Sequence, residues 1–582
     1  MSARPIIAVV PFGARSSDPR AGAWARQIAR RLVERSGDAM EIRPVFLVAM
    51  PEETSGEGHL IFGSTPPADL AAQYGVSLGA SHVLTGTFRD DAGARRLEAQ
   101  LVDSGRRTVV ADETFTIAAG ELQMIEDAVA EWLARSVGAA ASPARSVPAN
   151  EPAYAALLEG MDEEVNATLL RQSDTERSAQ ALHAAMDRYL ESVRSDPDGT
   201  AAEERLLVLA AESLERGTVT HEIHALESLA EARPRSWRAH YILGQLRAEA
   251  EDGNGAIVAF EHAHSLKLLP DADVVRLAEL YANASAPAPA LAHLRRVPKT
   301  SASYGAAQEL TAIIAFQRGE LDAGREAFAR ATEAGTSSWE LHASYGAAAH
   351  ARGELAEAAA HYRDALAAGA PGVVRLNLAR VALAAKDRDA ALTELDALLD
   401  RERTGEVAGH ARRLRFGLRE PELERDLERS GQAALAGDAT AIDAAEATFR
   451  RVLAIDDDLW EAHFGLGIVA RQRGDAARAQ RAFRRVLELW PDQPDALHEL
   501  GVALLMSDET NAALRALDQA ASLRPEDAAY VADAGFAHLR AGNLVSARER
   551  LERAAHLDSA DPITKSYLGE LARVEGEVGK KR

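Results

Sequence analysis

Hydrophobic and polar residues in the first 140 positions follow two periods, which predicts a mixed α/β domain. Strands are predicted where apolar residues run together or alternate with polar ones: residues 6–12, 41–50, 81–89, 96–103 and 108–117. Helices are predicted where apolar residues recur at helical spacing: residues 21–32, 68–74 and 121–137. The alternation in the last three strands favours a half-buried antiparallel sheet. Pro44 should place its strand at a sheet edge or bend the start of the strand, because proline cannot donate to the ladder.

Three segments of this region carry a family resemblance: IAVVPF at 7–12, HVLTGTFR at 82–89 and RLEAQLVD at 96–103. Together with the order of the predicted elements, they resemble the bacterial TolB-like amino-terminal domain. The resemblance implies an interaction or regulatory accessory domain without catalytic residues. Residues 139–152 follow, rich in Ala, Ser and Pro without periodicity, and they predict a linker.

Beyond the linker the pattern is helical and repeats every 34 residues. Glycines hold this spacing near the carboxyl end, and large apolar residues hold it in two separate runs: Gly467, Gly501, Gly535 and Gly569; Phe449, Phe483, Leu517 and Leu551; Leu226, Phe260, Leu294, Phe328 and Tyr362. This period resembles that of the tetratricopeptide repeat, a pair of helices that is stable only when stacked on its neighbours. The predicted fold is therefore an α/β domain followed by an all-α superhelical solenoid of about eleven helix pairs.

The two runs are out of phase. Tyr362 and Phe449 are 87 residues apart, which is two periods plus 19, so an extra helix over 405–418 and a break in the superhelix are expected. The predicted segments are these: α/β domain 1–138, linker 139–152, first repeat segment 153–403, extra helix or break 404–419, second repeat segment 420–561, and capping helix with tail 562–582.

Composition narrows the function classes. The 582 residues carry a formal charge of −23, which argues against broad nucleic-acid binding and against adhesion to anionic membranes. The absence of cysteine excludes disulfides, cysteine nucleophiles and thiolate metal sites. No apolar stretch is long enough for a signal peptide or a membrane span. We expect a cytoplasmic protein, and the Ala- and Arg-rich composition suggests a bacterial source.

No constellation for catalysis or cofactor binding is found, and no metal site is predicted. The pairs His221/His224 and His262/His264 lack the spacing of a zinc motif on one helix face. The acidic runs at 196–199 and 456–458 lack the glutamate of a calcium loop and are interpreted as inter-repeat turns. The basic residues around Arg412 share their stretch with many acidic ones, which favours an ion-paired helix over a phosphate or RNA site.

The resemblance places partner contacts on the first helix of each repeat. Counted along the most regular repeats, the groove residues are Glu461, Phe464, Ile468, Arg471, Gln472, Asp495, His498, Val502, Leu505, Met506, Phe536, Leu539 and Arg540. An apolar strip with a charged rim suits a peptide with hydrophobic anchors. The alternative is that Phe464, Leu505 and Phe536 are only core.

The predicted function is a non-catalytic scaffold for protein or peptide partners. Its alternative is a regulator whose amino-terminal domain senses a ligand or partner and whose repeats contact a signalling enzyme.

Overall fold

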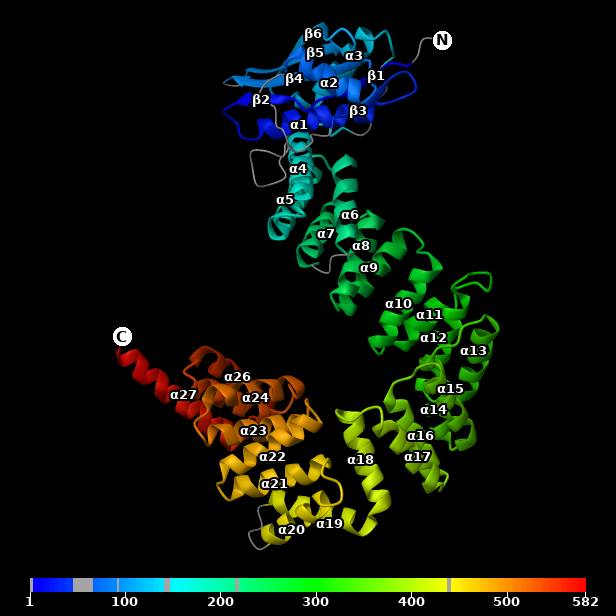
Figure 1. Ribbon diagram of the computed structural model, residues 1–582, viewed down its shortest axis with the longest axis vertical. Coiled ribbons are helices and arrows are strands. Elements are labelled where there is room, and N and C mark those ends of the chain that lie inside the picture. The colour runs from blue at the N-terminus through cyan, green and yellow to red at the C-terminus, as the bar shows by residue number, and fades with distance from the viewer. Residues whose placement is uncertain are drawn as a thin grey trace. The chain divides into compact units, whose positions relative to one another are not determined.

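The computed structural model describes residues 4–45, 66–91, 94–140, 147–214, 219–436 and 441–581. The chain divides into two compact units, Met1–Ser301 and Ala302–Arg582, which are described separately. The first holds the α/β region and helices α4 to α11, and the second holds helices α12 to α27 (Figure 1).

The α/β region is built on one mixed sheet. Its strands are β1 (Ile6–Val9), β2 (Gly13–Ser16), β3 (Glu41–Pro44), β4 (His82–Asp91), β5 (Ala94–Asp103) and β6 (Thr108–Ile117). The order is β3-β1-β4-β5-β6, and β2 pairs with β4. Strands β4, β5 and β6 are antiparallel, as the sequence predicted, whereas β1 runs parallel to β3 and to β4. Pro44 lies in β3 at the sheet edge, which confirms that expectation.

The strand predicted over 6–12 is divided in two. The first part, β1, ends at Val9, and β2 begins at Gly13 and pairs further along β4. Pro11 lies between them and lacks the N–H that a continued ladder would need, which explains the interruption. The part of the predicted strand at 46–50 lies outside the described residues.

Helices cover both faces of this sheet: α1 (Ala21–Arg31) with the 3-10 turn η1 (Leu32–Arg35), α2 (Ala68–Ser77), and the 3-10 turn η2 (Leu122–Met124) with α3 (Ile125–Ser136). Helices α1 and α3 share an apolar core with Leu84 and Leu101. Helix α2 packs on the opposite face, against Val83 and Val102. Successive side chains of a strand point to opposite faces, so each strand feeds both cores.

Helix α4 (Glu151–Leu170), the first helix of the array, belongs to the core of the α/β region. Tyr154, Ala155 and Leu158 join the cluster formed by α1, α3 and the sheet. On another face of the same helix, Leu157 and Met161 pack against the following helices. The residues of the predicted linker at 141–146 lie outside the described residues, but its end is the start of α4. The linker composition alone did not indicate this packing.

The remaining helices of the first unit follow in sequence: α5 (Thr175–Ser195), α6 (Ala201–Ser213), α7 (Thr220–Ala232), α8 (Trp237–Glu249), α9 (Gly253–Leu266), α10 (Asp271–Asn283) and α11 (Pro287–Leu294). The second unit begins with α12 (Tyr304–Gln317), α13 (Leu321–Glu333), α14 (Trp339–Arg352), α15 (Leu355–Ala367), α16 (Gly372–Ala384), α17 (Arg388–Leu399) and α18 (Glu406–Arg419). It ends with α19 (Pro421–Ala436), α20 (Ile442–Leu453), α21 (Trp460–Gln472), α22 (Ala476–Leu489), α23 (Pro494–Leu505), α24 (Thr510–Leu523), α25 (Ala528–Arg540), α26 (Leu544–Leu557) and α27 (Pro562–Lys581).

The helix pairs share one packing rule. A glycine in the first helix faces a large residue 16 positions later in the second helix: Gly244 and Phe260, Gly346 and Tyr362, Gly467 and Phe483, Gly501 and Leu517, Gly535 and Leu551. A Cβ atom on Gly467 would lie 2.5 Å from the Phe483 ring, so the helices approach this closely only because that atom is absent. Gly474 has a φ of +75°, the left-handed conformation expected just after the helix end.

Helix α18 occupies the place where the change of phase predicted an extra helix. It contributes Ala408 and Ala411 to a cluster with α16 and α17, and Phe416 to a cluster with α19 to α22. The Gly405 N–H also donates to the Leu489 carbonyl at 2.8 Å. At the carboxyl end, α27 covers the last pair with Tyr567 and Leu571, as a capping helix should.

Candidate functional site

The predicted groove residues lie on or at the ends of α21, α23 and α25, the first helices of three successive pairs. Ile468 and Leu539 are buried within apolar clusters, so they are packing residues and offer no surface to a partner. Met506 and Arg540 are exposed. The others are half-buried: Glu461, Phe464, Arg471, Gln472, Asp495, His498, Val502, Leu505 and Phe536.

The three apolar anchors proposed from sequence also stabilise the stack. Phe464 packs edge-on against Phe483, with ring centroids 5.5 Å apart. Phe536 stacks on Tyr567 of the capping helix at 4.3 Å. Leu505 packs against two apolar clusters. The alternative interpretation, that these side chains are core, therefore describes their contacts, although each keeps part of its surface exposed.

Polar residues of the same face join neighbouring repeats to one another. His498 Nε2 lies 2.8 Å from Asp533 Oδ2, and Tyr567 donates to the other oxygen of Asp533 at 3.0 Å. Tyr530 donates to Asp495 at 2.5 Å. Two further groove positions are tied in the same way: Arg471 Nε lies 2.7 Å from Glu499 Oε2, and Gln472 Nε2 donates to the Ala434 carbonyl. These groups hold the register of the stack, so a partner meets a face that is already organised.

Glu461 on this face carries a carboxyl group with a strongly shifted pKa. Its Oε2 atom is buried and has no hydrogen-bond partner among the described residues. Burial raises the pKa of Glu461 from 4.5 to about 7, and the nearby Arg413 only partly opposes the shift. The carboxyl is therefore largely protonated in the folded protein at mildly acidic pH.

We expect Glu461→Gln to remove a pH dependence of stability. Between pH 4.5 and 7 the folded state keeps a proton that the unfolded state releases, so wild-type stability falls as pH rises through this window. Each pKa unit corresponds to about 1.4 kcal/mol, so the variant should be more stable than wild type at pH 8, by at most about 3 kcal/mol. Urea denaturation at pH 5 and pH 8 measures the difference. An equal effect at both pH values would contradict the shifted pKa.

Among the described residues, the histidines singled out from sequence belong to no group of three or more potential metal ligands. Each has a separate contact: His221 stacks on His183, His224 pairs with Glu227, His262 stacks on His240, and His264 accepts the Leu269 N–H. The basic side chains around Arg412 are ion-paired, as predicted: Arg412 with Asp458, Arg413 with Glu424, Arg415 with Asp396 and Asp456, and Arg419 with Asp396.

A buried polar network joins the α/β region to the first helix of the array. Glu126 on α3 pairs with Arg31 on α1 and accepts a hydrogen bond from Tyr154 on α4 at 2.5 Å. Burial raises the pKa of Tyr154 well above its ordinary value, so its hydroxyl keeps the proton that it donates. Arg35 lies 3.7 Å from the second Glu126 oxygen. A carboxylate with two arginines and a phenol inside an apolar core fixes α4 against the α/β region.

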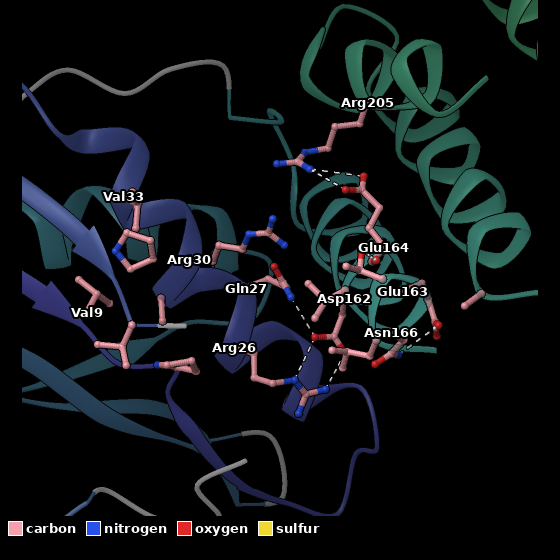
Figure 2. A pocket seen from close by; sticks show the side chains of 18 of the residues that line it. Val9, Arg26, Gln27, Arg30, Val33, Asp162, Glu163, Glu164, Asn166 and Arg205 are labelled. Atoms are coloured by element: carbon pink, nitrogen blue, oxygen red, sulfur yellow. Dashed lines mark hydrogen bonds and ion pairs between the residues drawn. The ribbon is translucent and has the colours of Figure 1, made fainter. Parts of the chain in front are cut away.

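Beside this network lies a cavity of about 890 Å³ (Figure 2). Val9 and Val45 line it where two parallel strands end, and α1 and α4 form opposite walls. Asp162 on α4 accepts hydrogen bonds from Arg26 and Gln27 on α1 at one edge, as the dashed lines show. Sequence reasoning missed this cavity because its walls come from segments far apart in the chain. Arg26 and Asp162, for example, are 136 positions apart.

Comparison with known families identifies three stretches of the helical array. Models described as tetratricopeptide repeat match residues 309–373, 431–494 and 470–534. The chain contains tetratricopeptide repeats. One solved structure, titled "MamA RS-1 ArsTM double mutant", is similar at 19% identity, covering 32% of this chain and 95% of that chain with a TM-score of 0.22. No curated protein matches the sequence.

Tetratricopeptide repeats imply a scaffold for protein–protein interaction, and the family consists of interaction modules rather than catalytic ones. The matches include α21, α23 and the first half of α25, and Phe536, Leu539 and Arg540 of the predicted groove lie beyond the last matched residue, 534. Among the residues that the structure describes, no helix is long and apolar enough to cross a membrane.

Proposed function

We propose that this protein is a non-catalytic cytoplasmic scaffold that binds a segment of a partner protein along α21, α23 and α25. The observation that carries the proposal is an apolar strip on α23. Val502 and Met506 are four residues apart and share a helix face, and Met506 is 46% exposed. Phe464 on α21 and Phe536 on α25 add partly exposed aromatic surface on either side in the stack.

The polar contacts of the same face favour a partner with spaced hydrophobic anchors. Beside the strip, Arg471 Nε lies 2.7 Å from Glu499 Oε2, and His498 Nε2 lies 2.8 Å from Asp533 Oδ2. These polar side chains already have partners within the scaffold, so specificity rests on apolar side chains that enter between them. A short helix of a partner would supply such anchors every three to four residues. An extended segment would supply them every two residues.

Partner capture tests this proposal. We expect Met506→Asp to weaken partner binding about 10-fold or more, because a charge then faces the desolvated centre of the interface. The tagged protein is purified from its own cells, the co-purifying proteins are identified by mass spectrometry, and the binding of each is remeasured with pure components. Val545→Asp is the matched control, because Val545 is an exposed apolar residue (74%) on α26, a second helix.

Phe464→Asp is unsuitable for this test because the side chain also packs against Phe483. Circular dichroism must show that each variant keeps its helices. A partner that binds Met506→Asp and wild type equally, with both proteins folded, contradicts the groove on α23.

The second candidate function is a regulator whose TolB-like amino-terminal domain binds a ligand. The cavity between α1 and α4 favours this regulator. Its volume lies within the range of small-molecule sites, and its walls come from both the α/β region and the helical array. A ligand bound there would raise the melting temperature of the intact chain. Arg30 and Arg205 line the cavity, so Arg30→Glu and Arg205→Leu should abolish that rise while Met506→Asp leaves it unchanged.

A further inference from the structure

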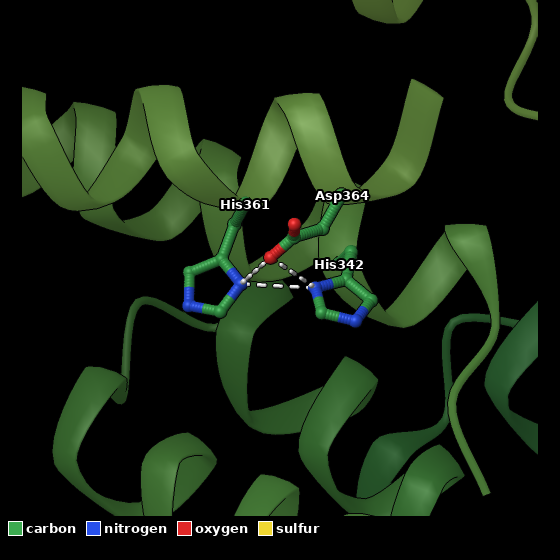
Figure 3. A group of neighbouring side chains, drawn as sticks. All are labelled: His342, His361 and Asp364. Carbon is green, nitrogen blue, oxygen red and sulfur yellow. Dashed lines mark hydrogen bonds and ion pairs between the residues drawn. The ribbon is translucent and has the colours of Figure 1, made fainter. Parts of the chain in front are cut away.

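Three potential metal ligands converge in the repeat formed by α14 and α15 (Figure 3). His342 lies on α14, and His361 and Asp364 lie three residues apart on α15. The two Nδ1 atoms are 2.9 Å apart, and Asp364 Oδ2 lies 3.8 Å from the first and 4.0 Å from the second. Three ligand atoms from two helices thus point at one small volume, as the figure shows.

We propose that His342, His361 and Asp364 bind a divalent transition-metal ion, with Zn²⁺ as the best match. Two imidazoles and a carboxylate are ligands that Zn²⁺ accepts in proteins. In a tetrahedral site with bonds of about 2.0–2.2 Å, the ligand atoms lie roughly 3.3–3.5 Å apart. The three observed separations bracket this range, so small side-chain adjustments bring all three atoms to bonding distance.

The two imidazole rings are already held in place by their surroundings. Ser337 Oγ lies 2.9 Å from His342 Nε2, and in the tautomer in which Nε2 donates to it, Nδ1 presents its lone pair. His361 stacks on Tyr345, with ring centroids 3.9 Å apart. The edge of Phe328 packs against both imidazoles, at 5.4 and 5.3 Å. A partner on the second ring nitrogen, as Ser337 is for His342, is typical of metal-binding histidines.

Without an ion, two Nδ1 atoms at 2.9 Å need a proton between them, because two lone pairs would otherwise face each other. A metal ion would replace that proton and join α14 to α15. Asp364 is well exposed, with 60% of its side chain accessible, so the site has an entry path from solvent. Three protein ligands leave a fourth position for water or for a donor from a partner.

The test is Zn²⁺ binding by protein that has been stripped with a chelator and purified without a metal-affinity column. Isothermal titration should find one equivalent that is lost in His342→Gln and in His361→Gln, and weakened at least about 10-fold in Asp364→Asn. Zn²⁺ should raise the melting temperature of wild type but not of the histidine variants. Co²⁺ in the same site should give a visible absorption spectrum that disappears in these variants.

His350→Gln is the matched control, because His350 lies on α14 but outside the cluster. It should bind Zn²⁺ as wild type does. The chain has other histidine contacts, so only an equivalent that is lost in the two histidine variants and weakened in Asp364→Asn counts. If all three retain every equivalent, or if wild type binds none, the proposal is wrong. Asp364→Asn changes an exposed side chain and keeps the test valid even if a histidine variant unfolds.

Discussion

Replacing Glu126 with glutamine should lower the free energy of unfolding of the amino-terminal unit by about 3–5 kcal/mol. Glu126 is 1% exposed, and both Arg31 and Arg35, which lie beside it, are 3% exposed. Removing the carboxylate charge leaves two guanidinium groups buried with weaker compensation. Their desolvation is then offset only by the more exposed carboxylates of Asp127 beside Arg35 and Glu34 beside Arg31, which makes this loss much larger than that of a surface ion pair.

Amide hydrogen exchange is the appropriate measurement, because a multi-unit chain need not unfold in one step. Protection should fall in α1, α3 and α4 together. Glu126 lies on α3, and it contacts Arg31 of α1, Arg35 of the adjoining turn η1 and Tyr154 of α4. Glu131→Gln on α3 is the matched control. Its pair with Arg135 is exposed and 4.0 Å long, so a change within about 0.5 kcal/mol is expected. Equal effects of the two substitutions would show that the buried network contributes little.

The second large effect is expected at Phe483, which is fully buried against Gly467. Phe483→Ala should destabilise the carboxyl-terminal unit by about 3–5 kcal/mol, because the ring leaves a cavity between two helices that cannot fully close. Gly467→Ala should lower the free energy of unfolding by about 1–3 kcal/mol because it overpacks the same contact. Its new Cβ would lie 2.5 Å from the Phe483 ring.

The two changes should be non-additive. In the double variant, the methyl group introduced by Gly467→Ala enters space that the Phe483 ring has vacated. The free energy of unfolding of the double variant should therefore fall by less than the sum of the two single decreases. Urea denaturation followed by circular dichroism, with hydrogen exchange to locate the loss, measures the cycle. Gly431→Ala on α19 is the control: a Cβ there meets nothing within 4 Å, so stability should stay equal or rise by about 0.5–1 kcal/mol. Strict additivity would contradict the packing rule.

Much of the repeat architecture could be predicted because its signals are local and recur. The 34-residue spacing placed Gly467 and Phe483 in successive helices, and the phase change placed the extra helix within one residue of α18. The groove was less predictable. Counting along the first helix selected thirteen positions, but Ile468 and Leu539 are buried by neighbours that the count does not include. The metal candidate was missed because His342 and His361 come from different helices, and no short motif links them.

The sequence by itself determined the α/β class of the first region, most of its strands and helices, the repeat period and the place of the helix at α18, although it merged β1 and β2 into one strand. It could do so because helix and strand periods, glycine positions and chain phase are encoded in neighbouring residues. Only the tertiary structure decided that α4 belongs to the core of the α/β region, that Glu126 joins Arg31 to Tyr154, and that His342 meets His361 and Asp364. Each of these depends on side chains from separate elements, whose meeting is set by packing and desolvation rather than by any local pattern.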